Sequence, residues 1–296
     1  MDLVLDGSHL TIHDVERVAR EGDKVSISDE AGERINACRE MIQRKIDAHE
    51  VMYGVTTGIG EFSEVVLSPE QVLDFQKYLV YSHAAGIGEP MPLEVVRGAM
   101  VSRINVHCHG NSGGRLEVTQ LLIDMLNQGV TPVVASKGSV GACGDLSPMS
   151  QIAMAMMGEG EAFFEGKRMP SADALSSAGL NPIELEARDG LAIINGSNML
   201  TAMAALTLCD ALRWLKYHDI SAAMTLEALN ANLLAFDPRL HELKGFNGSM
   251  QVASNILKLT EGSAIVTSTG KKVQDAYSLR STPQVIGSLK DAMKYA

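Results

Sequence analysis

The feature that most constrains this fold is a long stretch of chain without helix breakers. From Ser197 to Asp237 the sequence contains neither glycine nor proline. As one α-helix this stretch would be roughly 60 Å long, at about 1.5 Å per residue. Leucine, methionine and alanine occupy much of its circumference, so we predict a central bundle helix buried against other helices or other subunits. We therefore expect an oligomer.

Composition indicates a globular chain with a large core. The chain has 296 residues, of which 46% are hydrophobic, enough for one large domain or two modest ones. Its apolar runs end well short of the roughly 20 residues that a membrane-spanning helix needs, and its first residues form no basic leader. We expect a soluble, cytoplasmic protein without a membrane partner.

Charge and cysteine usage exclude several classes of function. The formal net charge of −11 would repel nucleic-acid phosphates, so we expect no nucleic-acid partner and favour small-molecule chemistry. The four cysteines are far apart and form no CxxC pair, so we expect reduced thiols and no disulfide framework. They are Cys38, Cys108, Cys143 and Cys209.

Local patterns predict a mainly helical chain with a few short strands. We expect a strand at residues 3–5, and helices capped by Thr11 and Ser28. Ser147-Pro148 predicts a helix with proline at its first position, which Gly158 ends. Further helical patterns cover residues 69–82, 92–108 and 115–127.

The order of these patterns predicts two domains. Residues 159–190 are expected to form loops and short strands beside the helices. We predict an N-terminal active-site domain over residues 1–190 and the first part of a central helical bundle over residues 191–296.

Motifs for nucleotides and metals are incomplete. Residues 57–60 and 86–88 contain glycines, but neither segment completes GxGxxG or ends in Gly-Lys-Ser/Thr, so no nucleotide is expected. His107-Cys108-His109 suggests a metal pair, yet adjacent side chains rarely converge on one ion. We favour a loop packed against polar neighbours and expect no metal.

The segment from Lys137 to Met149 is unusual because three glycines surround one thiol just before a helix. Gly138, Gly141 and Gly144 flank Cys143, and such a backbone can bend very tightly. Spacing alone favours a turn that holds a buried cysteine.

This segment resembles the active-site loop of the histidine, phenylalanine and tyrosine ammonia-lyases, which reads Gly-Ser-Val-Gly-Ala-Ser-Gly-Asp-Leu-Ala-Pro-Leu. Residues 52–60, 191–197 and 273–280 resemble further motifs of that family in the same order. The resemblance covers nearly the whole chain. It implies a mainly α fold: a long-helix bundle of the ammonia-lyase/fumarase-like type, with a small N-terminal region of loops and short strands that carries the active-site loop.

The resemblance also implies a prosthetic group. In the family the glycine nitrogen attacks the alanine carbonyl, and dehydration leaves a methylidene-imidazolone, formed autocatalytically. Carried over, its atoms belong to Ala142, Cys143 and Gly144. Cys143 stands where the family has serine, so ring formation here would expel hydrogen sulfide in place of one water. The product is an electrophile of a kind that no ordinary side chain provides.

The remaining catalytic roles follow from the same motifs. Tyr53 is the expected base for the β-proton, and Arg280 offers a planar fork for the substrate carboxylate. Asn195 is expected to hydrogen-bond the ring or the amine, and Tyr277 and Gln274 resemble residues that orient the ring and the substrate.

Two positions point to the substrate. His83 resembles the position that selects histidine, and Asn198 stands where the histidine branch usually has glutamine. Asp145 is expected to hold the loop backbone. The resemblance thus implies a histidine ammonia-lyase, a carbon-nitrogen lyase that gives urocanate.

Two other functions stay open. The first is a lyase of the same fold without the cyclised group, which eliminates trimethylamine from a thiolhistidine betaine resembling ergothioneine. The second is a non-catalytic helical assembly subunit. The family continues beyond the position of Ala296 with the rest of its bundle. We therefore expect either a fragment or a chain that a second polypeptide completes. We also expect a homotetramer.

Overall fold

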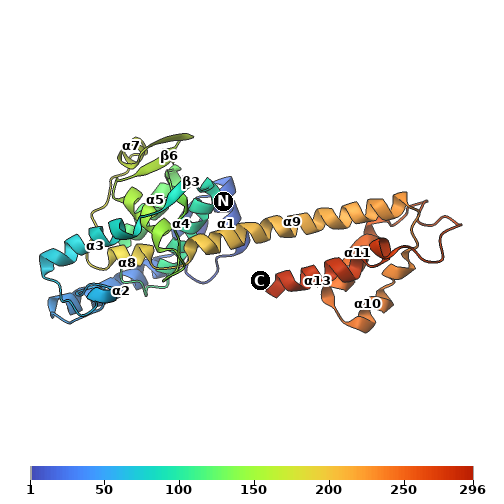
Figure 1. The fold of residues 1–296 in the computed structure, drawn as a ribbon, viewed down its shortest axis with the longest axis horizontal. Coiled ribbons are helices and arrows are strands. Elements are labelled where there is room, and N and C mark those ends of the chain that lie inside the picture. The colour runs from blue at the N-terminus through green and yellow to red at the C-terminus, as the bar shows by residue number, and fades with distance from the viewer. Residues whose placement is uncertain (1, 296) are drawn as a thin grey trace. The chain divides into compact units, whose positions relative to one another are not determined.

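The computed structural model describes residues 2–295, which form two compact units (Figure 1). The first unit runs to Leu206 and the second begins at Thr207. Helix α9 (Asn198–Ala228) begins in the first unit and continues in the second. Helices dominate both units, as the sequence predicts.

Eight helices precede α9 among the described residues. They are α1 (Ile12–Glu16), α2 (Asp29–Asp47), α3 (Pro69–His83), α4 (Leu93–His107), α5 (Leu116–Gln128), α6 (Leu146–Met156), α7 (Ser171–Ser177) and α8 (Asp189–Ile194). A π-helical turn, Arg17–Glu21, continues α1, and Gly60–Phe62 forms a 3-10 turn.

The strands of this unit are short and form three small sheets. Strand β1 (Leu3–Leu5) pairs in parallel with β2 (Val25–Ile27). Strand β3 (Ile87–Pro90) is antiparallel to β5 (Ala135–Lys137). Strand β6 (Glu161–Phe164) lies between β4 (Thr131–Pro132) and β7 (Lys167–Pro170), antiparallel to both.

Side-chain caps set the first helices where the sequence predicts them. The Thr11 side chain accepts a hydrogen bond from the Asp14 backbone N–H, and the Asp14 carboxylate accepts one from the Thr11 backbone N–H. Ser28 caps α2. The prediction for α6 is wrong by two residues, because this helix begins at Leu146 and Pro148 occupies the third helical position. Proline is tolerated there because the first turn has no internal partner for its missing N–H.

The core of the first unit centres on α4, which is buried along almost its whole length. Val96, Ala99, Met100 and Ile104 are fully buried there. Side chains of α3, α5 and α6 belong to the same apolar cluster. A polar group on α4 must therefore find its partners inside the protein.

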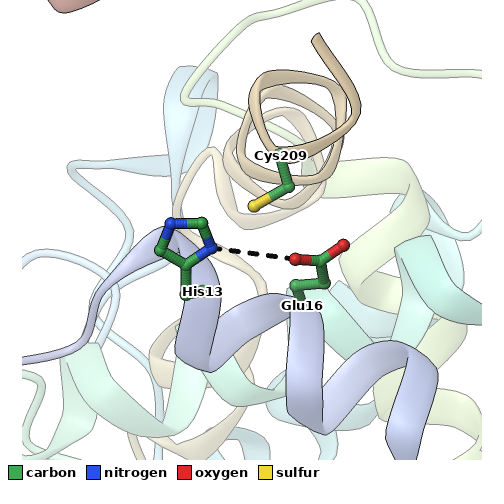
Figure 2. Close-up of side chains that lie close together, drawn as sticks. All are labelled: His13, Glu16 and Cys209. Atoms are coloured by element: carbon green, nitrogen blue, oxygen red, sulfur yellow. Dashed lines mark ion pairs between the residues drawn. The ribbon is translucent and has the colours of Figure 1, made fainter. Parts of the chain in front are cut away.

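Polar side chains of α1 and of the π-helical turn after it pair with one another and with α4. His13 Nδ1 lies 3.7 Å from Glu16 Oε2 (Figure 2). Glu16 Oε1 accepts a hydrogen bond of 3.0 Å from Arg20, whose Nε donates to Glu94 on α4 at 2.7 Å. These pairs fasten α1 to α4.

The second unit contains the rest of α9 and a smaller helical cluster. Its helices are α10 (Pro238–Lys244), α11 (Asn247–Leu259), α12 (Tyr277–Arg280) and α13 (Thr282–Tyr295), with a 3-10 turn at Leu233–Phe236. The backbones of helices α11 and α13 are in close contact at two glycines. A Cβ on Gly248 would lie only 2.0 Å from the Gly287 carbonyl oxygen. Lys290 on α13 forms a buried ion pair of 2.6 Å with Asp219 on α9.

The prediction of one helix from Ser197 to Asp237 is wrong, because α9 ends at Ala228. Asn230 adopts φ +51°, and the Ala231 N–H then bonds back to the Leu226 carbonyl at 2.9 Å. Asparagine enters the left-handed region more readily than most residues, so it ends the helix where glycine usually would. Lys271 secures the bend by donating to the Asn230 side chain at 2.9 Å.

Over residues 2–295, no helix combines the length and apolar character that crossing a membrane would require.

Candidate active site

The glycine-rich segment forms a tight turn with Cys143 at its tip. Gly141 and Gly144 face each other in an antiparallel bridge, so the chain reverses across Ala142 and Cys143. Cys143 adopts φ +56° and Gly144 φ +91°. Cys143 is exposed, so the expectation of a buried cysteine is wrong. A positive φ is unfavourable for a residue with a Cβ, which makes this turn a strained point in the backbone.

The turn is attached directly to the start of α9. Gly144 bridges to Gly196, and the Asp145 N–H donates to the Gly196 carbonyl at 2.8 Å. A Cβ on Gly144 would lie 2.5 Å from that carbonyl, so only glycine allows this approach. Asp145 accepts hydrogen bonds from the Leu200 N–H at 2.9 Å and from Ser139 at 3.2 Å.

A buried arginine on α4 supports the other side of the Gly196 peptide. The Arg103 guanidinium donates to the Asn195 carbonyl at 2.5 Å, to Asn198 Oδ1 at 3.1 Å and to the Ala192 carbonyl. A Cβ on Gly196 would lie 2.6 Å from Arg103 Nη1. Gly196 is thus held between Arg103 and Gly144.

His107 lies behind this arginine and is not part of a loop. It is the last residue of α4, and Cys108 follows it, also buried. Arg103 Nε lies 3.1 Å from His107 Nε2, and Thr119 Oγ1 lies 2.9 Å from His107 Nδ1. Burial, together with the Arg103 charge, lowers the pKa of His107 to about 3, so its imidazole is neutral near pH 7.

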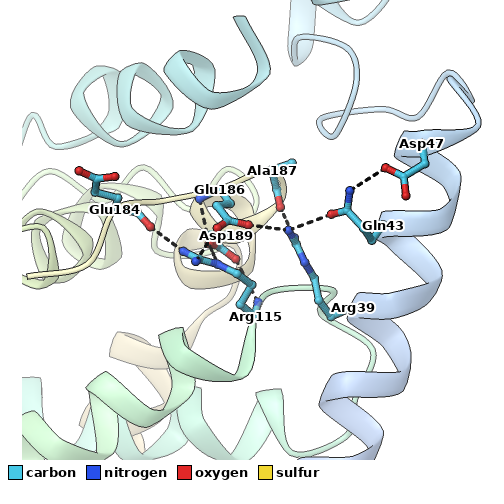
Figure 3. A network of polar contacts seen from close by, with 8 residues as sticks. All are labelled: Arg39, Gln43, Asp47, Arg115, Glu184, Glu186, Ala187 and Asp189. Carbon is cyan, nitrogen blue, oxygen red and sulfur yellow. Dashed lines mark hydrogen bonds and ion pairs between the residues drawn. The ribbon is translucent and has the colours of Figure 1, made fainter. Parts of the chain in front are cut away.

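The N-terminal end of α8 is held by a second polar network (Figure 3). Asp189 is fully buried and accepts from the Arg115 N–H at 3.0 Å and from its Nε at 2.8 Å. Arg115 also pairs with Glu186 at 2.8 Å, and Arg39 reaches both Glu186 and the Ala187 carbonyl. With Arg103 bonded at its other end, α8 is fixed in place just before Asn195.

Tyr53 and His83 lie on neighbouring elements of this unit. Tyr53 is 61% exposed, and its phenol oxygen accepts from the Gly60 N–H at 3.3 Å. A Cβ on the adjacent Gly54 would lie 2.4 Å from the Leu191 side chain, so this turn packs on α8. His83 ends α3, and its Nδ1 lies 2.8 Å from the Leu79 carbonyl.

Most of the predicted site residues fall into two groups, and Tyr53 and His83 belong to neither. Ala142, Cys143, Gly144, Asn195 and Asn198 come together through Gly196 and Arg103, as described above. Among the described residues, neither Tyr53 nor His83 has a hydrogen bond to that turn.

The second group belongs to the second unit. The Arg280 guanidinium stacks on the Tyr277 ring at 4.0 Å, and its Nε donates to the Asp275 carbonyl at 3.1 Å. Gln274 is exposed beside them.

Sequence reasoning missed Arg103. Its signal is a single charge inside the otherwise uncharged run of residues 98–106. A charge in the buried face of a helix requires partners, but the sequence does not show that those partners lie around residue 195.

The first unit therefore has a tight turn that carries a thiol and is attached to the start of a long helix. The profile of the aromatic amino acid lyases matches residues 10–296, and the chain belongs to that family. Histidine ammonia-lyases of Alkaliphilus oremlandii and Clostridium tetani are 44% and 45% identical to it, over 99% of this chain. The matches cover 58% and 57% of those proteins, so the chain spans less than two thirds of their length.

Solved structures that resemble this chain support the same family assignment. The Treponema denticola enzyme Ergothionase, described as degrading ergothioneine, superimposes with a TM-score of 0.94 at 28% identity, covering 100% of this chain and 59% of that one. Histidine ammonia-lyase from Trypanosoma cruzi gives 0.90 at 33% identity, covering 100% and 55%. The predicted family and the predicted long-helix fold are confirmed.

Proposed function

We propose that the protein is a cytoplasmic carbon-nitrogen lyase that eliminates ammonia from L-histidine to give urocanate. The observation that carries the proposal is the exposed turn of Ala142, Cys143 and Gly144 at the start of α9. Similarity to histidine ammonia-lyases over 99% of the chain supports the choice of substrate. Because the chain spans about 58% of their length, the activity is proposed for this chain together with the remainder, from the same or a second polypeptide, in a homotetramer.

The geometry of the turn supports the formation of a methylidene-imidazolone. Its ends are paired, Cys143 and Gly144 both have positive φ angles, and Gly144 carries no side chain to block the approach of its nitrogen to the Ala142 carbonyl. In ring formation the Gly144 nitrogen bonds to the Ala142 carbonyl carbon, and the carbonyl oxygen leaves as water with the amide protons of Gly144 and Cys143. Cys143 loses its α-proton and its Sγ, which leave together as hydrogen sulfide. The group supplies an electrophile when it is present.

The side chains then have separate tasks. Tyr53 takes the β-proton at its phenol oxygen, which the Gly60 N–H holds in place. Arg280 binds the substrate carboxylate with its planar fork, while Tyr277 stacks against it and restricts its rotation. Asn195 hydrogen-bonds the ring or the amine, and Gln274 orients the substrate.

Selection of histidine is assigned to His83 and Asn198. Donation from His83 Nδ1–H to the Leu79 carbonyl leaves Nε2 as an acceptor for the N–H of a substrate imidazole. Asn198 Oδ1 is occupied by Arg103, so the substrate contact falls to its amide nitrogen.

The test measures turnover and mass together on the complete protein. Urocanate should accumulate from L-histidine, and the peptide spanning residue 143 should be lighter by one water and one hydrogen sulfide. Cys143→Ser should keep the activity, because water can leave in place of hydrogen sulfide, and Cys143→Ala should abolish it, because nothing can leave. No urocanate between neutral and alkaline pH would refute the proposal.

A second candidate has support from the likeness to Ergothionase and from the unusual Cys143. In it the ring does not form, and the protein releases trimethylamine from a thiolhistidine betaine, whose amine already leaves readily. An unmodified peptide around residue 143 with rapid trimethylamine release would select this candidate over the first.

A further inference from the structure

A pocket of about 280 Å³ lies along α8, and its lining includes Arg188 just before this helix and Asn195 just after it. Nine residues line it, and Arg103, Arg188 and His109 are among them, whereas no aspartate or glutamate is. This is unusual in a chain with 36 acidic and only 25 basic residues. The lining therefore favours an anion.

Arg188 offers the donors for such an anion. It is half-buried, and its Nε donates to the Ser112 carbonyl at 2.8 Å. Within residues 2–295 its two terminal nitrogens have no hydrogen-bond partner and no ion pair with a carboxylate. Arg188 lines the pocket and therefore brings unused hydrogen-bond donors to it.

A second positive charge lies close to it. Arg103 is bonded to carbonyls, to an amide oxygen and to His107, and none of these partners neutralises its charge. Burial and the nearby Arg188 charge lower the pKa of Arg103 to about 10, so Arg103 is charged at pH 7, as arginine side chains in proteins are in general. A bound anion would relieve their repulsion.

We propose that this pocket binds a small oxyanion, a carboxylate or a phosphate, through the terminal nitrogens of Arg188 next to the charge of Arg103. Guanidinium groups bind both classes bidentately. The polar residues Asn111 and Ser112 also line the pocket. Its volume is below the roughly 300–1,000 Å³ of pockets for drug-sized ligands, which suits an ion or a small acid.

The first experiment measures binding of inorganic phosphate and of acetate by calorimetry, at constant ionic strength in chloride. Saturable binding to the wild-type chain is expected, and Arg188→Gln should weaken it roughly tenfold or more, the loss of a charge-assisted bond. Glutamine carries the same backbone strain as arginine at φ +76°. Arg44→Gln, at an exposed position, removes the same charge and should bind as the wild type does.

The two anions separate the possible sources of the ligand. Tighter phosphate binding identifies a phosphate site, and tighter acetate binding identifies a carboxylate site, such as that of a small acid. No saturable binding of either anion, or equal binding by Arg188→Gln, would overturn the proposal.

A second measurement needs no variant. Phenylglyoxal modifies accessible arginines, and peptide mapping can follow each one in the folded wild-type chain. The preferred anion should slow modification of Arg188 and leave that of Arg44 unchanged, while equal rates at Arg188 with and without anion would contradict the proposal. Neither experiment depends on turnover, so failure here is distinct from failure of the lyase proposal.

Discussion

Arg103 and His107 show how one charge is accommodated inside an apolar helix. Arg103 sits one helical turn before His107 on α4, and both side chains are almost completely buried. The neutral imidazole accepts from the guanidinium, whereas a protonated one would repel it. The pair is therefore stable only while His107 stays unprotonated.

This pair predicts a loss of stability in acid. The folded pKa of His107 is about 3, against 6.5 as its ordinary value. Below pH 6.5 the unfolded chain binds a proton that the folded chain does not bind until about pH 3. The free energy of unfolding should therefore fall as the pH drops through this window, by about 1.4 kcal/mol per unit from this group.

Urea unfolding at several pH values between 7 and 4 measures this effect. His107→Gln removes the titrating group, so its unfolding free energy should approach that of the wild type as the pH falls. His109→Gln, at an exposed position, should keep the wild-type pH dependence. A difference between wild type and His107→Gln that does not change with pH would contradict the assignment.

At the scale of elements, the short helix α8 links the reactive turn to the rest of the first unit. Its N-terminal end is tied by Asp189 and its C-terminal end by Arg103. Since Arg103 also fixes the Asn195 carbonyl, it acts as a positioning residue for the peptide that holds Gly144.

Arg103→Lys should reduce the fraction of chains that cyclise. Lysine keeps the positive charge but lacks the planar guanidinium group. It therefore leaves buried acceptors without a donor, which costs about 1–3 kcal/mol of stability for each acceptor. Arg97→Lys is a matched control, because Arg97 is also on α4 and donates to the carbonyls of Val18 and Leu126. Both variants should lose stability in thermal unfolding, but only Arg103→Lys should show less cyclised peptide by mass spectrometry. Equal cyclised fractions would exclude the positioning role.

The end of α9 gives a prediction about stability. Asn230 holds φ +51°, where a β-branched residue is about 1–2 kcal/mol less favourable. Asn230→Val should therefore destabilise the chain more than Asn230→Gly, although both lose the bond from Lys271. Urea unfolding compares them, and equal losses would show that the side-chain bond, and not the backbone angle, ends the helix.

These elements also show what the sequence could predict. Local signals placed the caps at Thr11 and Ser28 correctly, because a cap depends on residues three positions apart. The end of α9 was missed because asparagine is a weak stop signal and its partner Lys271 lies far along the chain. The reactive turn was identified from its motif, but Arg103 was not, because the contacts that define its role span about 90 positions.

At the scale of the whole molecule, α9 presents an apolar surface in the second unit. Its exposed apolar side chains there are Leu212, Trp214, Tyr217, Ile220 and Met224. Patches of this kind are typical of surfaces that pack against another protein chain, and we propose that this one is covered in the assembled protein. This agrees with the expectation from sequence that the long helix packs against other helices or other subunits.

Met224→Asp should weaken assembly of the complete protein. Met224 is 65% exposed in the single chain, and a carboxylate buried at an interface is costly. Light scattering coupled to size exclusion should show a smaller species, with helical content unchanged by circular dichroism. Ser288→Asp adds the same charge at an exposed position on α13 and should leave the size unchanged; an unaltered mass for Met224→Asp would place the assembly surface elsewhere.

The conformation of Cys143 affects which residues could replace it during evolution. Its backbone angle favours glycine or asparagine, and its exposed thiol has no hydrogen-bond partner within residues 2–295. Selection for folding alone would therefore exchange it for one of those residues. Gly196 could not be replaced in this way, because Arg103 leaves no room for a side chain there. A lineage that gave up the chemistry would be expected to lose the cysteine first and to keep Gly196 long afterwards.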